Sequence, residues 1–194
     1  MDKSNTAATP ARRPRADARR NVDAVLEAAA EVFATSGVDA PVREVANKAG
    51  VGTATLYRHF PTRADLIQAV FRREVDTCVE AARQLASTHP PREALEQWLF
   101  RFMGFISTKR GLAPALQSGD ATYESLPGYF LGSLGPALQD LLDAAAAAGV
   151  IATDIGATDL LLAVSRLCTP GPTDDDPRRL AQMFIPVLLR GMSA

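Results

Sequence analysis

The stretch AGVGTATLYRHFPTRADL, residues 49–66, contains a glycine turn followed by a short segment that carries threonine, tyrosine, arginine and histidine. Gly50 follows the helical segment 42–49, and glycine tolerates the positive φ that a tight turn between two helices requires. Ala46 is small enough to let two short helices cross closely. With a second short helix over 53–59, the pattern predicts a helix-turn-helix whose second helix is the candidate recognition helix.

The two predicted helices have an apolar side and a polar side. The residues expected to face a preceding helix are Val45, Ala49, Val51 and Leu56. The residues expected to point outward are Thr53, Ala54, Thr55, Arg58 and His59. Hydroxyl and guanidinium groups suit the major groove of DNA, where they meet base edges and phosphates. The alternative is an ordinary corner between two helices with a polar face.

Helical periodicity continues through the rest of the chain, and no alternating strand pattern competes with it. The expected helices cover about 17–36, 42–49, 53–59, 63–85, 95–106, 127–148, 157–167 and 177–192. Glycines and prolines between 111 and 136 are expected to interrupt the helices there, and TPGPTDDDP, residues 169–177, is the clearest loop. We therefore predict an all-α protein.

The net charge of −1 is unevenly distributed along the chain. Residues 1–73 hold 12 Lys and Arg against 8 Asp and Glu, whereas residues 74–194 hold 9 against 14. The positive part contains the predicted helix-turn-helix and the run RRPRADARR, residues 12–20. Taken alone, such a run is typical of a solvated, disordered tail. The acidic second part argues against a protein that coats DNA with basic charge over much of its surface.

The sequence REVANKAGVGTATLYRHFPTRADL, residues 43–66, resembles the signature of the TetR family of transcriptional regulators. That signature has R-[DE]-[IV]-A on one helix, followed by V-S-x-x-T-x-Y-x-H-F-x-x-K-x-x-L, and the resemblance extends over about residues 17–72. The chain departs from it at Gly52, where a serine is common, and at Arg63, which replaces a lysine and keeps its charge. The change at Gly52 removes a side-chain cap and one phosphate contact from the pattern.

The resemblance implies which side chains contact DNA. Those implied to contact the phosphate backbone are Thr55, Tyr57, His59 and Arg63. Those implied to face base edges are Arg43, Thr53, Ala54 and Arg58. Several family members extend an arginine arm toward the minor groove, so Arg15 and Arg19 become candidate contacts. The expected organisation is a disordered basic arm at 1–16, a DNA-binding domain at 17–72, and a ligand-binding and dimerisation domain at 73–194.

The second domain carries no such signature, and its counterpart in the family usually encloses a small-molecule pocket. The aromatic residues that could line an apolar cavity are Trp98, Phe102, Phe105, Tyr123, Tyr129 and Phe130. Polar groups that could orient a ligand there are Arg101, Gln117 and Asp120. Aromatic residues at helical spacing are also typical of a plain core, which is the alternative.

The last two helices contain DLLLAVSRLC, residues 159–168, and MFIPVLL, residues 183–189, which are apolar almost all round. A helix on a domain surface needs only one apolar stripe, so a second copy of the chain is expected to cover another face across 157–192. The family resemblance likewise implies a two-fold homodimer. The alternative places these helices at the centre of a monomer.

Other classes of function find little support in the sequence. The histidines are His59, in the predicted recognition helix, and His89, beside two prolines, so we expect no catalytic site, no metal site and no cofactor. Cys78 and Cys168 are expected to be buried thiols. No run of eighteen apolar residues occurs, so we expect no membrane span and a cytoplasmic protein. The expected function is a transcriptional repressor that a small-molecule ligand releases from palindromic operator DNA.

Overall fold

The computed structural model describes residues 13–116, 118–152, 155–168 and 177–192. Within those ranges all regular structure is helical, which confirms the all-α prediction. The elements in chain order are α1 Arg13–Ser36, α2 Val42–Ala49, α3 Thr53–His59, α4 Arg63–Thr88, α5 Pro91–Leu116, the 3₁₀ helix η1 Ala121–Tyr123, α6 Ser125–Ala147, α7 Ala157–Leu167 and α8 Pro177–Gly191.

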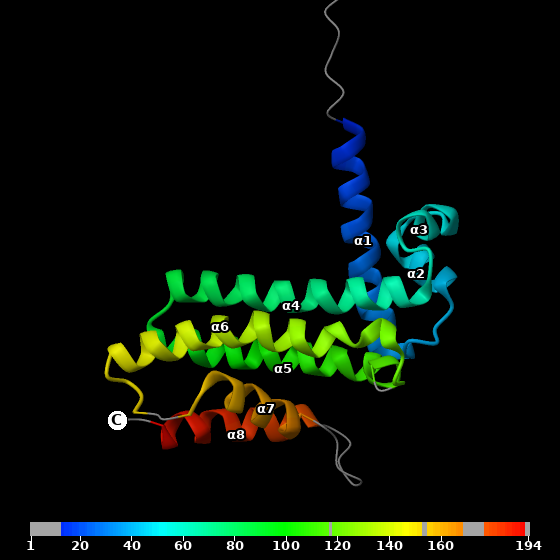
Figure 1. The fold of residues 1–194 in the computed structure, drawn as a ribbon. Coiled ribbons are helices and arrows are strands. Elements are labelled where there is room, and N and C mark those ends of the chain that lie inside the picture. The colour runs from blue at the N-terminus through cyan, green and yellow to red at the C-terminus, as the bar shows by residue number, and fades with distance from the viewer. Residues whose placement is uncertain (1–12, 117, 153–154, 169–176, 193–194) are drawn as a thin grey trace, which may run out of the picture.

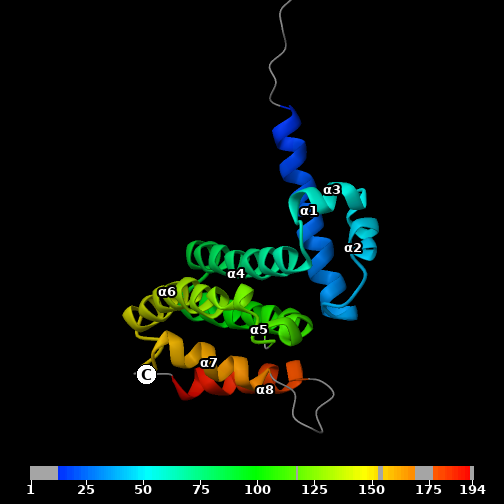
Figure 2. The same cartoon turned by 45° about the vertical axis from the view of Figure 1, so that its right-hand side comes forward.

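Two groups of helices meet where α1 packs against α4 and α5 (Figures 1 and 2). Helices α1, α2 and α3 form the N-terminal group, and the first half of α1 projects away from the rest of the fold. Helix α4 begins beside this group and continues into the second group, where it lies against α5 and α6. Helices α7 and α8 lie side by side on the side of α5 turned away from α4 (Figures 1 and 2). The buried side chains form one contiguous core from Val25 to Met192, so apolar packing joins the two groups.

The start of α1 differs from the prediction. Helix α1 begins at Arg13, four residues before the expected start at Asp17, so Arg15 lies on a helix. Alanine and arginine favour helix, and Pro14 stands in the first turn, where its missing N–H costs no hydrogen bond. The rest of the expected basic arm, residues 1–12, lies outside the described residues.

The middle of the second group is more regular than predicted. Helix α5 continues through Gly111 and Pro114, and α6 continues through Gly132 and Pro136, so the expectation of interruptions at these positions was wrong. A glycine costs only about 1 kcal/mol relative to alanine in a helix interior. The burial of the many apolar side chains of α6 outweighs that cost. The chain turns after α5 instead, where Gly119 has a φ of +75°.

The turn between α2 and α3 forms as the sequence predicts. Gly50 adopts φ 68° and ψ 27°, in the left-handed region. Its N–H donates to the Asn47 carbonyl at 3.2 Å, and the Val51 N–H donates to the Ala46 carbonyl at 3.0 Å. These two bonds make a Schellman motif, which ends α2 and directs the chain into α3.

We expect Gly50→Ala and Gly132→Ala to change stability in opposite directions. An alanine at position 50 keeps a positive φ at a cost of about 1–2 kcal/mol, although no neighbour lies within 4 Å of the added Cβ. Position 132 is exposed, helical and equally open, so alanine there should stabilise by up to about 1 kcal/mol.

Urea unfolding of the two variants and the parent, at one protein concentration, measures both effects. A Gly50→Ala variant as stable as the parent would contradict the left-handed turn.

Candidate nucleic-acid interface

Helix α3 presents a polar face to solvent. Thr53, Ala54 and Arg58 are exposed, and the Tyr57 side chain is 49% exposed. Thr55 and His59 were also expected to point outward, but both are half-buried. A large aromatic ring with a hydroxyl at its tip is thus held at the surface beside a guanidinium.

The opposite side of the helix-turn-helix is buried, as the sequence predicts. Leu56 of α3 and Val45 and Ala46 of α2 are in the core, and Ala49 and Val51 are packed against it. Both helices contact α1. This packing fixes which side of α3 faces outward.

The start of α3 lacks a side-chain cap. Gly52 precedes the helix with φ −71° and ψ 145°, and its carbonyl accepts hydrogen bonds from the N–H groups of Thr55 and Leu56. The glycine therefore supports the first turn through its backbone alone. This agrees with the loss of the cap that a serine supplies in the family pattern.

The other cationic residues of the N-terminal group differ in exposure and in their partners. Arg43 is exposed on α2, and Arg19 is exposed on α1. Lys48 of α2 forms an ion pair with Glu31 of α1 at 2.7 Å. Arg15 lies on α1, but its side chain is outside the described part of the structure. Arg43 and Arg19 are thus accessible to a phosphate backbone.

Arg63 has partners that the sequence did not predict. Its Nη1 atom donates to the Val38 carbonyl and, at 2.8 Å, to the Ala40 carbonyl. These carbonyls belong to the loop between α1 and α2, and the Arg63 side chain is half-buried. A phosphate contact by Arg63 stays a prediction, and the structure shows an intramolecular role beside it.

The start of α4 is fixed by a capping box. The Asp65 N–H donates to the Thr62 hydroxyl oxygen at 3.1 Å, and the Asp65 carboxylate accepts from the Thr62 N–H at 2.9 Å. The side-chain hydrogen bond from Thr62, followed by its backbone hydrogen bond, lowers the pKa of Asp65 below its ordinary value. The T-x-x-D spacing at 62–65 is a sequence signal for such a box, and the sequence reasoning missed it.

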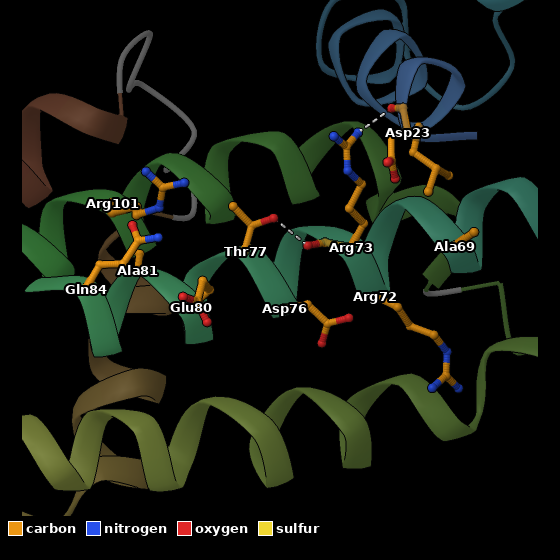
Figure 3. A pocket seen from close by; sticks show the side chains of 11 residues that line it. Asp23, Ala69, Arg72, Arg73, Asp76, Thr77, Glu80, Ala81, Gln84 and Arg101 are labelled. Carbon is orange, nitrogen blue, oxygen red and sulfur yellow. Dashed lines mark hydrogen bonds between the residues drawn. The ribbon is translucent and has the colours of Figure 1, made fainter. Parts of the chain in front are cut away.

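Helix α4 is bonded to α1 beside a surface hollow. Arg73 donates to the Asp23 carbonyl at 2.9 Å and lies 3.8 Å from the Glu27 carboxylate. Figure 3 shows this bond at one end of a hollow of about 510 Å³ that α1, α4 and Arg101 of α5 line. Burial raises the pKa of the nearby Glu74, while the charges of Arg73 and Arg101 oppose that effect.

Helix α4 is also bonded to α6. Arg72 donates to the Ser125 hydroxyl at 3.2 Å, and its guanidinium carbon lies 4.6 Å from the centre of the Tyr129 ring. The Tyr129 hydroxyl donates to the Asp76 carboxylate, and this bond is the main reason that the pKa of Tyr129 is raised. Tyr129 therefore connects two helices, and its role at a ligand cavity stays a prediction.

Four of the six predicted ligand residues form a packed aromatic cluster, Trp98, Phe102, Phe105 and Phe130. The Trp98 and Phe102 rings are stacked with centres 5.4 Å apart, and Phe102 lies 6.0 Å from both Phe105 and Phe130. The Trp98 N–H donates to the Cys78 carbonyl at 2.8 Å. These contacts are those of a plain core, and a ligand-binding role for the cluster stays a prediction.

The other residues expected at the pocket are Tyr123 and the polar residues Asp120, Arg101 and Gln117. Tyr123 is buried in η1, where burial raises its pKa and the Asp120 charge acts in the same direction. Asp120 is exposed and accepts a hydrogen bond from the Thr122 N–H at 2.8 Å. Arg101 is exposed, and Gln117 lies outside the described residues. None of the six predicted aromatic residues lines the hollow in Figure 3 or the hollows of about 390 and 440 Å³ elsewhere on α4.

Helices α7 and α8 leave large apolar side chains at the surface. We call these exposed side chains the α7/α8 face. They are Leu162, Met183, Phe184 and Val187. Met183, Phe184 and Val187 share one side of α8, where they are 56%, 44% and 53% exposed. The opposite side of α8 is buried through Ile185 and Leu189. The α7/α8 face is thus additional to the side that packs into the core.

Two other features are absent from the described residues. No cluster of three or more His, Cys, Asp or Glu side chains in that part of the chain could hold a metal ion. No helix there is both long and apolar enough to cross a membrane. Cys78 and Cys168 are buried, and burial raises the pKa of the Cys78 thiol to about 12.

A buried helix-turn-helix support with an exposed polar recognition helix defines a DNA-binding protein. Comparisons with known proteins agree: the family described as bacterial regulatory proteins, tetR family, matches residues 25–70. The C-terminal domain of SbtR-like transcriptional regulators matches residues 90–194. The chain belongs to the TetR family of DNA-binding transcriptional regulators, which are not enzymes.

Individual proteins similar to this chain are also transcriptional regulators. The TetR transcriptional regulator SCO0520 from Streptomyces coelicolor is 37% identical, and the match covers 88% of this chain and 97% of that one with a TM-score of 0.74. The transcriptional activator FasR from Mycolicibacterium smegmatis is 40% identical over 84 residues, which are 42% of this chain and only 38% of FasR. LfrR from Mycobacterium smegmatis, solved in complex with proflavine, is 22% identical over 91% of this chain and 97% of its own, and shares the fold with a TM-score of 0.63.

Proposed function

We propose that the protein is a homodimeric repressor that binds an inverted-repeat operator and leaves it when a small molecule binds. The observation that carries the proposal is the exposed polar face of α3, held outward by the buried Leu56 and the turn at Gly50. An exposed guanidinium, hydroxyl and phenol on one short helix match the groups that contact base edges and phosphates in a major groove.

The side chains of this face take two roles in the proposal. Arg58 and Thr53 on α3, with Arg43 on α2, are proposed to face base edges. All three are exposed, so DNA can reach them. Tyr57 and Arg19 contact phosphates, which position the protein without reading sequence. Thr55 and His59, being half-buried, reach only phosphates close to α3.

We expect Arg58→Ala and Tyr57→Phe to have different effects on DNA binding. Loss of a guanidinium that reads a base should cost about 1–3 kcal/mol in operator binding and relax specificity. Loss of the Tyr57 hydroxyl should weaken operator and unrelated DNA about equally, because a phosphate contact carries no sequence information. Competition mobility shifts with a mapped operator and an unrelated duplex measure both.

Lys48→Ala is the matched control for this comparison. Lys48 lies on the same helix-turn-helix, but its charge is paired with Glu31, so the variant should bind the operator nearly as the parent does. An Arg58→Ala variant that keeps the parent's affinity and preference would contradict the proposed role of α3.

The dimer is proposed because the α7/α8 face is apolar and exposed. Large apolar side chains that gather at a protein surface are typical of an interaction site. A two-fold arrangement covers the same patch on both copies at once. It also provides two recognition helices, so the DNA site should have matching two-fold symmetry.

We expect Val187→Asp to shift the protein from dimer to monomer. The Val187 side chain is 53% exposed in one chain, so an aspartate there is tolerated by the single subunit but places two charges in an apolar interface. Leu131→Asp, at an exposed leucine of α6, is the control and should leave the dimer intact. Sedimentation at micromolar concentration distinguishes the states, and a monomeric parent would rule out the dimer.

The ligand part of the proposal concerns the aromatic cluster of Trp98, Phe102, Phe105 and Phe130. Its rings contact one another, so a molecule can enter only where they move apart. A ligand that binds such an open state, and not the packed one, shifts the population toward it. The complex of LfrR with proflavine supports a small organic effector for this fold. We propose a small, largely apolar molecule.

We expect an effector and operator DNA to weaken each other's binding. Trp98 is the only tryptophan and is fully buried, so its fluorescence reports compounds that enter the cluster. A coupling of about 1–3 kcal/mol would lower operator affinity roughly 5- to 150-fold, and linkage requires the same factor for the ligand. Calorimetric titration of such a compound with and without operator measures the coupling; equal affinities would show that it is not an inducer.

Repression is proposed over activation because it requires only that the dimer occupy promoter DNA. The relative FasR is named an activator, so activation is the second candidate. Transcription in vitro from a promoter that contains the mapped operator distinguishes the two. Added protein should lower transcript yield, and a higher yield would favour activation.

A further inference from the structure

We propose that Arg63 is a positioning residue for DNA binding, which ties the loop before α2 to the start of α4 and so holds both ends of the helix-turn-helix. The inference rests on the proposed sequence-specific DNA binding. It differs from the role that the family pattern implies, a direct contact with a DNA phosphate.

The contacts of Arg63 close a ring around α2 and α3. Its backbone starts α4, directly after the short connection from α3, while its Nη1 atom donates to the Val38 and Ala40 carbonyls just before α2. The segment 41–62 therefore lies between two points that one side chain joins. Since loop closure restricts the relative positions of its ends, the bond limits how the recognition helix can tilt.

The loop that receives these bonds has little support of its own. Pro41 precedes α2 without any side-chain hydrogen bond to the helix, so the entry to α2 lacks the usual cap. Inside the loop the Ala40 N–H donates to the Gly37 carbonyl at a long 3.3 Å. The Val38 and Ala40 side chains are buried, and their carbonyls need donors where water is scarce. The Arg63 guanidinium supplies both.

The exit from α3 is fixed by local contacts, unlike the entry to α2. Phe60 is buried directly after α3, and the capping box of Thr62 and Asp65 fixes the first turn of α4. The base of Arg63 is therefore rigid, and its bonds pass that rigidity to the loop before α2.

The bonding pattern explains how lysine can stand at this position in the family pattern. Both carbonyls accept from the same nitrogen, Nη1. A lysine carries three N–H donors on one nitrogen, so Arg63→Lys can keep both bonds. Arg63→Met keeps an unbranched apolar stem but removes every donor and the charge.

The test compares Arg63→Met and Arg63→Lys with Arg19→Met, which removes the same charge from an exposed position of α1 that is proposed to contact a phosphate. Operator and random-duplex affinities of the full chain are measured from low to high salt. For Arg63→Met we expect operator binding to fall by roughly 10- to 100-fold, as for the loss of charged hydrogen bonds, with random-duplex binding and the salt slope unchanged. For Arg63→Lys we expect near-parental values. Arg19→Met should lower the salt slope.

Hydrogen exchange in the free protein provides the second measurement. Arg63→Met should speed amide exchange in the segment 38–44, and Arg63→Lys should restore slow exchange. The proposal is overturned if Arg63→Met leaves this exchange unchanged, or if it weakens both DNAs equally and lowers the salt slope by about 0.9 per lost phosphate contact. A parent protein that does not prefer its operator contradicts the proposed function instead, while the exchange result still decides whether Arg63 holds the loop.

Discussion

Helix α4 runs without interruption for 26 residues, about 39 Å at 1.5 Å per residue, and takes part in contacts that join the two helix groups. Its first residue, Arg63, is bonded to the loop before α2, and ten residues later Arg73 is bonded to α1. Farther along α4, Asp76 accepts a hydrogen bond from Tyr129 of α6, and the Cys78 carbonyl accepts one from Trp98 of α5. The orientation of α3 therefore depends on where the second helix group holds α4.

This constraint gives the proposed regulation a physical route. The aromatic cluster touches α4 directly, since the Phe105 ring lies 5.9 Å from Phe71 in an edge contact and Trp98 donates to the Cys78 carbonyl. A ligand that displaces Phe105 or Trp98 would therefore shift α4 or break these contacts. Because Arg63 and Arg73 attach α4 to the N-terminal group, a displaced α4 carries the recognition helix with it. In a dimer that movement changes the spacing between two recognition helices.

The parts of the structure that the sequence predicted are those with local causes. The turn at Gly50 follows from backbone sterics, and the ends of α2 and α3 follow from helical periodicity and that turn. The buried side of the helix-turn-helix, with Val45 and Leu56, follows from the same periodicity. Local chemistry at the start of α4 also carried a usable signal, the T-x-x-D spacing at 62–65.

The parts that the sequence could not predict depend on distant partners. Arg63 is bonded to carbonyls 23 and 25 positions away, and Tyr129 to a carboxylate 53 positions away, and neither pairing has a sequence pattern. Aromatic spacing around Trp98 and Phe102 fits a packed core and a ligand cavity equally well, because both need rings on one helix face. The continuity of α5 and α6 through glycine and proline was mispredicted since tertiary burial outweighed local propensity.

We propose that two copies of this chain present α3 to DNA at a spacing set by α4. Selection of binding sites from a pool of random duplexes by the purified full chain tests it most directly. We expect an inverted repeat whose half-site centres lie about 34–36 Å apart, or somewhat more, on one face of the DNA. An enriched motif without a dyad, or no enriched motif under conditions in which the protein is folded and dimeric, would contradict it.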